Sequence, residues 1–268
     1  MIWTIKKGFY RIIHKFENLI VKRMTKQEPK LLTGPGSIKD LHTAIKNEGV
    51  CKPLVVTDKG LTNLRIHNEM FQTFNENNIE YVVFDDVLPN PTISMVETAK
   101  NVYLENKCDC IIGFGGGSPM DCAKIALALV VKPEKTVRDL GRFFRIKNDV
   151  PPFFVVPTTA GTGAETQFAG VIADPDTHEK FAVASTKLLP KYVVLDPELT
   201  LGLPPHITSA TGMDALTHAV ESYINIIGDA SSAENATKAV KIVFDNLVNL
   251  YENGNQIEAR EEMARAAY

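Results

Sequence analysis

The sequence Gly113-Phe114-Gly115-Gly116-Gly117-Ser118-Pro119-Met120-Asp121 joins an apolar stretch to a helical pattern. Before it, Cys110-Ile111-Ile112 is typical of a buried strand, and Pro119 suits the first turn of a helix. Consecutive glycines let a ligand approach the backbone and offer N–H groups to it. Because the dipole of the following helix also favours negative charge, this loop predicts a phosphate or pyrophosphate site. A tight turn without a ligand is the alternative, but four glycines in five positions exceed what a turn needs.

The same loop excludes one common nucleotide site. It has no Gly-Lys-Ser/Thr ending, so a nucleotide-hydrolysing P-loop is not expected, and it does not read G-x-G-x-x-G. A second loop of small polar residues, Pro157-Thr158-Thr159-Ala160-Gly161-Thr162-Gly163-Ala164-Glu165, follows the apolar run Phe153–Val156. Since ligands of open α/β sheets bind at the carboxyl ends of strands, both loops are expected to line one crevice.

Asp58 directly follows the predicted strand Leu54–Thr57. An acid at that place can bind both ribose hydroxyls and repel a 2′-phosphate, which favours NAD over NADP. Here the acid precedes the glycine loop, which reverses the usual order of a dinucleotide fingerprint. From position alone, an aspartate that caps a helix or turn is an equal alternative.

On both sides of these loops, apolar runs typical of strands alternate with helical patterns. This alternation indicates βαβ units and a mostly parallel sheet. The expected strands are Leu54–Thr57, Tyr81–Phe84, Cys110–Gly113 and Phe153–Val156. The expected helices among them are Leu61–Asn75 and Thr92–Asn106. Hairpin or edge strands are expected around Val171-Ile172, Phe181–Val183 and Tyr192–Leu195. After Pro204-Pro205 only helical patterns follow, at Ile207–Ile224, Ala233–Tyr251 and Glu258–Tyr268.

The predicted fold class is therefore α/β, a Rossmann-like parallel-sheet domain over residues 29–203 and the start of an all-helical domain over 204–268. Residues 1–28 form a predicted amphipathic extension. Between Ile2 and Val21 apolar residues recur at helical spacing, with lysines and arginines opposite them. We expect this helix to pack on its own body or on a second subunit, and a membrane-surface helix is the alternative. Neither a cleavable signal nor a transmembrane helix is expected.

Composition narrows the class of protein. Of the 268 residues, 44% are hydrophobic and 23% are charged, which is ordinary for a globular protein with a sizeable core. The net charge of −3 gives no general attraction to nucleic acid or to anionic membranes. The four cysteines include Cys108-Asp109-Cys110, a C-x-C rather than a C-x-x-C. We expect buried free thiols and a cytoplasmic protein.

Asp214 and His218 lie four residues apart within the helical stretch Ala210–Glu221. Residues at that spacing share one helix face, so a carboxylate and an imidazole can converge on one metal ion. A surface ion pair is the more common reason for such a pair. A metal site needs at least three protein ligands, and no histidine follows His218, so the sequence offers half of a site.

Together these motifs identify a resemblance. Gly115 to Asp121, Pro157 to Glu165 and Gly212 to Glu221 resemble, in order and approximate spacing, the iron-containing alcohol dehydrogenases. The segments Val56 to Lys59 and Pro89 to Thr92 are also similar, so the resemblance covers about residue 30 to the end. It implies the fold shared with dehydroquinate synthase, with the active site between the sheet domain and the helical domain. Glycerol dehydrogenase and dehydroquinate synthase themselves match the Asp214–His218 segment less well.

The resemblance implies site residues and a reaction. Asp58 and Asn90 would contact the adenosine side of the cofactor, and Gly116, Gly117 and Ser118 its pyrophosphate. The predicted cofactor-binding residues are Asp58, Asn90, Gly115, Gly116, Gly117, Ser118, Asp121, Thr158, Thr159, Thr162 and Lys180. Asp214 and His218 would be two of four metal ligands, with Fe²⁺ expected and Zn²⁺ as the alternative. The implied reaction is hydride transfer between NAD, or less favourably NADP, and a small primary alcohol or aldehyde, with the metal as Lewis acid.

In the family two further histidine ligands follow the segment that ends here at Tyr268, so we expect the chain to lack the C-terminal part and to show poor activity or solubility alone. A homodimer is expected of the complete enzyme. Two other functions stay open. One is a non-catalytic nucleotide-binding remnant, or half of a split enzyme; the other is an interaction protein that uses the basic helix Ile2–Val21.

Overall fold

The computed structural model describes residues 28–268, except 142–145, 178, 226–227 and 229. The predicted amphipathic extension therefore lies outside the described residues, apart from its last position. Among the described residues, no helix combines the length and the apolar character that crossing a membrane requires.

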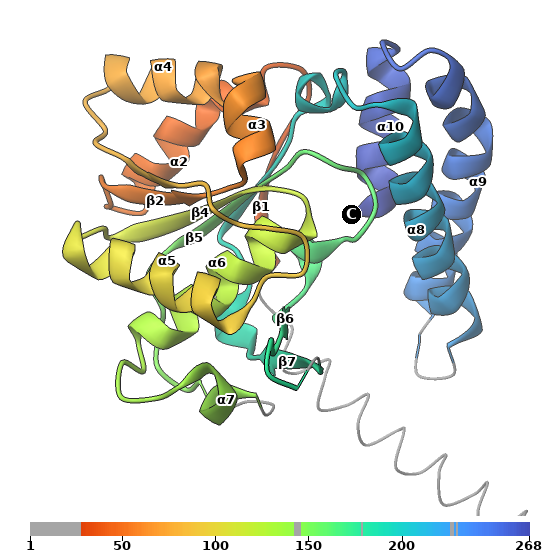
Figure 1. Cartoon of the computed structure of the whole chain (residues 1–268). Helices are drawn as coiled ribbons and strands as arrows, with labels where there is room; N and C mark the ends of the chain where they lie inside the picture. Colours follow the sequence, from red (N-terminus) through yellow and green to blue (C-terminus); the bar gives the residue numbers. More distant parts are fainter. Residues whose placement is uncertain (1–27, 142–145, 178, 226–227, 229) are drawn as a thin grey trace, which may run out of the picture.

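A parallel sheet forms the centre of the molecule (Figure 1). Its strands are β1 (Lys30–Thr33), β2 (Pro53–Val56), β3 (Val82–Phe84), β4 (Cys110–Gly115), β5 (Phe153–Pro157) and β8 (Tyr192–Leu195). Their order is β1-β8-β5-β4-β2-β3, and every neighbouring pair is parallel. The four inner strands are buried along their whole length, as expected when helices cover both faces. The predicted α/β class is confirmed.

Successive strand residues point to opposite faces, and each face has its own core. Leu54, Val56 and Ile111 pack with α5 (Ile93–Glu105) and α6 (Gly117–Val130). Val55 and Ile112 pack with α2 (Leu41–Asn47) and α4 (Asn68–Glu76) on the other face. Figure 1 shows the two helix layers with the sheet between them. The short elements are η1 (Ser37–Asp40), α3 (Lys59–Leu64), α7 (Val137–Leu140), η2 (Ala164–Thr166), η3 (Thr186–Leu188) and η4 (Pro197–Thr200).

Two sequence predictions of local structure are wrong. The single helix predicted over Leu61–Asn75 is broken into α3 and α4, because Arg65 adopts the left-handed conformation (φ 57°). The N–H of Arg65 donates to the carbonyl oxygens of Leu61 and Thr62 and ends α3. The run Tyr192–Leu195 is neither a hairpin nor an edge strand. It forms β8 between β1 and β5, and its uniformly buried side chains explain why it lies inside the sheet.

The hairpin predicted from the other two runs is confirmed. β6 (Ala169–Ala173) pairs antiparallel with β7 (Lys180–Ala184) outside the main sheet. The hairpin lies directly against α6. A Cβ added at Gly170 would be only 3.0 Å from the carbonyl oxygen of Asp121. The backbone of β6 therefore follows the surface of the helix that begins at the glycine loop.

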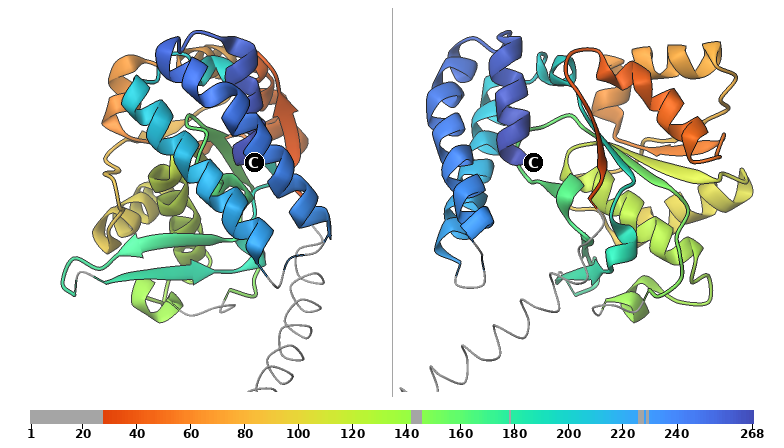
Figure 2. Two further views of the ribbon diagram at one scale, coloured as in Figure 1. Left: turned by 90° about the vertical axis from the view of Figure 1, so that its right-hand side faces the viewer. Right: turned by 180° about the vertical axis from the view of Figure 1, so that it is seen from behind.

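Three helices complete the chain: α8 (Pro205–Ile224), α9 (Ala230–Glu252) and α10 (Ile257–Ala267). Figure 2 shows them side by side at one end of the sheet. They share a small core around Ala215, Val243 and Leu250. These helices expose large apolar side chains, namely Met213, Val220, Tyr223, Ile224, Phe244, Val248 and Tyr251. The change from sheet to helices lies near residue 204, and the domain boundary placed there stays a prediction.

Candidate functional site

The glycine loop closes β4 and opens α6. Gly115, the last residue of β4, has φ 141°, which side chains rarely tolerate, and a Cβ there would lie 2.8 Å from Cγ of Pro119. Gly116 occupies the N-cap position and Gly117 begins α6. The first N–H groups of a helix have no partner within the helix, so those of α6 face the mouth of this loop. This geometry suits an anionic group.

The second loop, from Pro157 to Glu165 and called the threonine loop below, lies directly against the glycine loop. The N–H of Thr158 donates to the carbonyl of Gly115 at 3.0 Å, which ties the ends of β4 and β5 together. A Cβ added at Gly116 would lie 3.4 Å from Oγ1 of Thr159, and one at Gly117 would lie 3.3 Å from Oγ1 of Thr162. The two hydroxyls therefore flank the glycine backbone, and the predicted common crevice exists.

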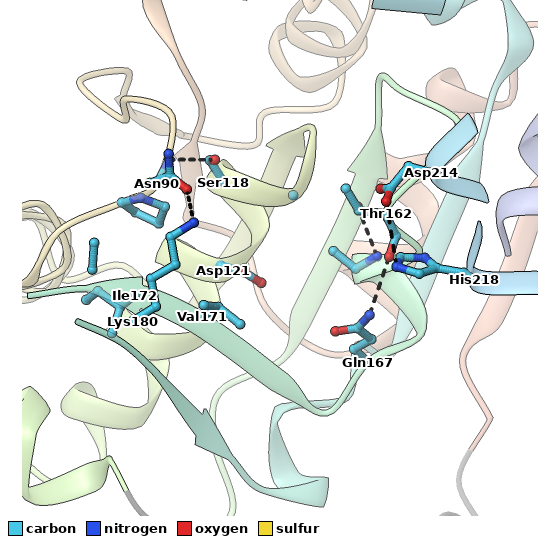
Figure 3. A pocket seen from close by; sticks show the side chains of 14 residues that line it. Asn90, Ser118, Asp121, Thr162, Gln167, Val171, Ile172, Lys180, Asp214 and His218 are labelled. Carbon is cyan, nitrogen blue, oxygen red and sulfur yellow. Dashed lines mark hydrogen bonds and ion pairs between the residues drawn. The ribbon is translucent and has the colours of Figure 1, made fainter. Parts of the chain in front are cut away.

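Two cavities meet at the start of α6. One, of about 630 Å³, is lined by Asp58, Leu61, Leu88, Thr158, Thr159 and Ile207, among others. The other, of about 310 Å³, is lined by Asn90, Asp121, Thr162, Gln167, Val171, Lys180, Asp214 and His218, among others (Figure 3). Gly117 and Ser118 line both cavities. A ligand with two bulky halves joined by an anionic linker fits this arrangement.

Of the two roles that the sequence left open for Asp58, the structure shows the helix cap. Its Oδ1 accepts the N–H of Leu61 at 3.0 Å, so it caps α3. The residue is only half-buried and lines the larger cavity, and its contact with a ribose stays a prediction. A Cβ at Gly60 would lie 2.9 Å from Asp58 Oδ1, which makes glycine the residue that best accommodates this carboxylate.

Asn90 and Lys180 form a polar bridge along one side of the smaller cavity. Lys180 Nζ, from β7, donates to Oδ1 of Asn90 at 2.6 Å, and the N–H of Asn90 donates to Oγ of Ser118 at 3.3 Å. Figure 3 shows this chain of contacts between the hairpin and the glycine loop. Asn90, with φ 58°, lines the smaller cavity and not the one that contains Asp58, so the structure does not bring these two residues together.

Asp214 and His218 lie one turn apart on α8 and face the smaller cavity (Figure 3). Nε2 of His218 is 3.7 Å from Oδ1 of Asp214, and both side chains are nearly half exposed. Within the described part of the chain, no group of three or more His, Cys, Asp and Glu residues is arranged to hold a metal ion. The predicted half-site is therefore present as two adjacent donors, and their role as ligands stays a prediction.

Sequence reasoning missed a buried charged cluster behind the smaller cavity. Lys124 of α6 is fully buried, and burial lowers its pKa to about 8. Burial also raises the pKa of Asp121 to about 6 and that of Glu165 to about 7. Asp121 was predicted only as a cofactor contact. The available signal was a single lysine within the apolar run Cys122-Ala123-Lys124-Ile125-Ala126-Leu127.

Known proteins match the chain over nearly all of the described residues. The family model for iron-containing alcohol dehydrogenases matches residues 28–197, and the model for the C-terminal part of that family matches residues 208–268. The NAD-dependent methanol dehydrogenase of Bacillus methanolicus is 34% identical over 240 residues, which are 90% of this chain and 63% of that protein. The 1,3-propanediol dehydrogenase of Citrobacter freundii is 36% identical over 87% of this chain and 61% of its own length.

Solved structures agree with these matches. A crystal structure of 1,3-propanediol oxidoreductase superposes with a TM-score of 0.86 at 35% identity, over 89% of this chain and 63% of that one. The sulfoacetaldehyde reductase of Bifidobacterium kashiwanohense in complex with NAD⁺ gives 0.82 at 27% identity, over 90% and 64%. This chain thus spans about three fifths of the length of the relatives it matches. It belongs to the iron-containing alcohol dehydrogenase family.

Proposed function

We propose that this chain binds NAD across the two cavities and supplies two metal ligands of an alcohol dehydrogenase that acts on a small primary alcohol or its aldehyde. The observation that carries this proposal is the meeting of both cavities at Gly117 and Ser118. The pyrophosphate would lie at the start of α6, the adenosine beside Asp58 and the nicotinamide in the smaller cavity.

The cavity linings support this orientation. The larger cavity is mostly apolar, with Leu61, Leu88 and Ile207 among its walls, and suits an adenine ring. The smaller cavity combines the apolar Val171 and Ile172 with the polar Thr162. There the apolar walls would exclude water from one side of a nicotinamide, and the threonine hydroxyl would fix its direction.

The Asn90 and Lys180 pair has a separate role in this proposal. Lys180 Nζ donates to Oδ1 of Asn90, and the N–H of Asn90 donates to Ser118, so Asn90 links this cation to the glycine loop. We assign this cation to the neutralisation of the pyrophosphate charge. Asp58 would favour NAD, because a 2′-phosphate would have to approach its carboxylate.

The donor pair fits two positions of a metal site. Ligand distances of about 2 Å would allow one ion to bind Asp214 Oδ1 and His218 Nε2, which are 3.7 Å apart. When bound, the metal supplies Lewis acidity at the alcohol oxygen and the nicotinamide supplies the hydride acceptor. The chain's own part is to present this pair beside Thr162 and Gln167 at the wall of the nicotinamide cavity. Because an oxygen and nitrogen donor set suits both ions, Fe²⁺ is proposed and Zn²⁺ is the alternative.

Buried free thiols support a reducing compartment. Cys108, Cys110 and Cys122 are buried and unpaired with one another, although oxidising compartments favour disulfides. We therefore propose a cytoplasmic protein.

A metal titration tests the proposal. Zn²⁺ is titrated into the purified chain and into Asp214→Asn, His218→Ala and the control His206→Ala, which removes an exposed histidine from the first turn of the same helix. We expect weak binding by the wild-type chain and the control, and none by the two ligand variants. Equal binding by all four proteins would refute the assignment.

Turnover is the second part of the test. NADH formation from NAD⁺ and short primary alcohols is followed with Fe²⁺ or Zn²⁺ present. Two protein ligands hold a metal weakly and without fixed geometry, so we expect little turnover by this chain alone. Rapid alcohol oxidation by the 268 residues without a second polypeptide would contradict the half-site. Cofactor binding without turnover agrees with the half-site. For the chain alone, that result also favours the alternative of a non-catalytic nucleotide-binding unit.

A further inference from the structure

Lys124 is the buried cation of α6, and its ammonium group has two backbone partners. Lys124 Nζ donates to the carbonyl oxygen of Ala164 at 2.5 Å and to that of Ala169 at 3.1 Å. Its side chain is fully buried, and the adjacent residues Ala123 and Ile125 are buried and apolar. Burial of a charged group is costly unless hydrogen bonds and opposite charges compensate it. Here the two carbonyls and the nearby carboxyl groups of Asp121 and Glu165 provide that compensation.

These contacts hold both ends of one short segment. Ala164 begins η2 and Ala169 begins β6. One turn earlier on α6, the carboxyl group of Asp121 lies near the N–H of Val171, which favours its charged form. Two side chains of α6 therefore fix the backbone from residue 164 to residue 171. A residue without a donor at position 124 would leave the buried carbonyl of Ala164 and the partly buried carbonyl of Ala169 without this partner.

The segment between these anchors belongs to only one half of the groove. Ala164, Gln167 and Val171 line the smaller cavity, which Asp214 and His218 also line. None of the three lines the larger cavity beside Asp58. Lys124 lines neither cavity, so it can affect a ligand only through its neighbours, namely the segment that it holds and Asp121, which lines the smaller cavity.

We propose that Lys124 is a positioning residue that sets the wall of the nicotinamide half of the groove and leaves the adenosine half unaffected. This inference rests on the proposed function, because it requires that the nicotinamide lies in the smaller cavity. The length of the lysine side chain lets its ammonium group reach two carbonyl oxygens from the buried face of α6. Methionine has a similar length and an apolar end, so Lys124→Met removes the donor with little change in volume.

The test compares two ligands on the same proteins. NADH occupies both halves of the groove, and ADP occupies only the adenosine and pyrophosphate part. Both are titrated by calorimetry into the wild-type chain, Lys124→Met and the control Leu127→Met, a buried residue of the same helix in the apolar core. We expect Lys124→Met to weaken NADH binding about tenfold and ADP binding less than twofold, since the loss of one or two hydrogen bonds has roughly this effect. The control changes neither affinity.

A merely structural role of Lys124 predicts a different result. General loosening of the fold would weaken NADH and ADP by the same factor, and that outcome overturns the proposal, as does an unchanged NADH affinity. If Lys124→Met does not fold, Asp121→Asn removes the charge of the second anchor with its shape retained. The same split between NADH and ADP is expected for it, and its absence overturns the proposal. Failure of the wild-type chain to bind NADH would instead overturn the proposed function.

Discussion

Replacement of Gly161 by alanine tests the joint between the threonine loop and α8. A Cβ at Gly161 would lie 2.7 Å from the carbonyl oxygen of Thr211, 2.8 Å from its Cβ and 3.0 Å from its Cα. Two of these three atoms belong to the backbone, so no rotamer change relieves the contact. The loop and the helix must separate by roughly 0.7 Å to restore an ordinary van der Waals distance.

Overpacking of this kind costs about 1–3 kcal/mol. For a protein of this size, each kcal/mol lowers the midpoint of thermal unfolding by roughly 2–4 °C, so we expect a decrease of several degrees. Thermal unfolding followed by circular dichroism measures it. Gly202→Ala is the matched control, because no atom lies within 4 Å of a Cβ at that position. Equal midpoints for Gly161→Ala and Gly202→Ala would refute the close packing of loop and helix.

Three further predictions concern the cofactor loop, pH and the thiols. Gly117→Ala places a methyl group 3.3 Å from Oγ1 of Thr162. Calorimetry should then show about tenfold weaker NADH binding with little loss of stability. Unchanged NADH affinity would mean that the cofactor binds elsewhere. Burial lowers the pKa of His67, so the folded state resists its protonation and stability should fall as pH drops below 6.5. His67→Leu should lose less stability between about pH 7 and pH 5 in thermal unfolding, and parallel losses would contradict this origin. A thiol reagent should modify only the exposed Cys51 in the native protein. The reaction should be slow, because the charge of Asp109 raises the pKa of the Cys51 thiol. Reaction of further thiols before unfolding would contradict the burial of Cys108, Cys110 and Cys122.

The parts of the fold that the sequence predicted well have strong local signals. The strand, glycine loop and helix from Cys110 to Val130 are determined by an apolar run, by backbone positions that favour glycine and by a proline in the first helical turn. The hairpin of β6 and β7 follows from the turn at Asp174-Pro175-Asp176. The i and i+4 spacing placed Asp214 and His218 on one face, as the structure shows.

The missed features depend on distant partners. β8 lies in the sheet because β1 and β5 supply its neighbours, and β1 is a short edge strand with little pattern of its own. The break at Arg65 turns the buried His67 inward, which helical periodicity does not indicate. Lys124 lies in an apolar run, and its two carbonyl partners are 40 and 45 residues away in the sequence. Local pattern therefore predicted the glycine loop but not the contacts by which Lys124 holds Ala164 and Ala169.

A crystal structure of this chain with NAD⁺ would show whether the cofactor spans both cavities. We expect the pyrophosphate at the N–H groups of Gly116 to Ser118, the adenosine beside Asp58, and the nicotinamide in the cavity that Asp214 and His218 line. A nicotinamide in the larger cavity, or a cofactor that does not contact the start of α6, would contradict this expectation.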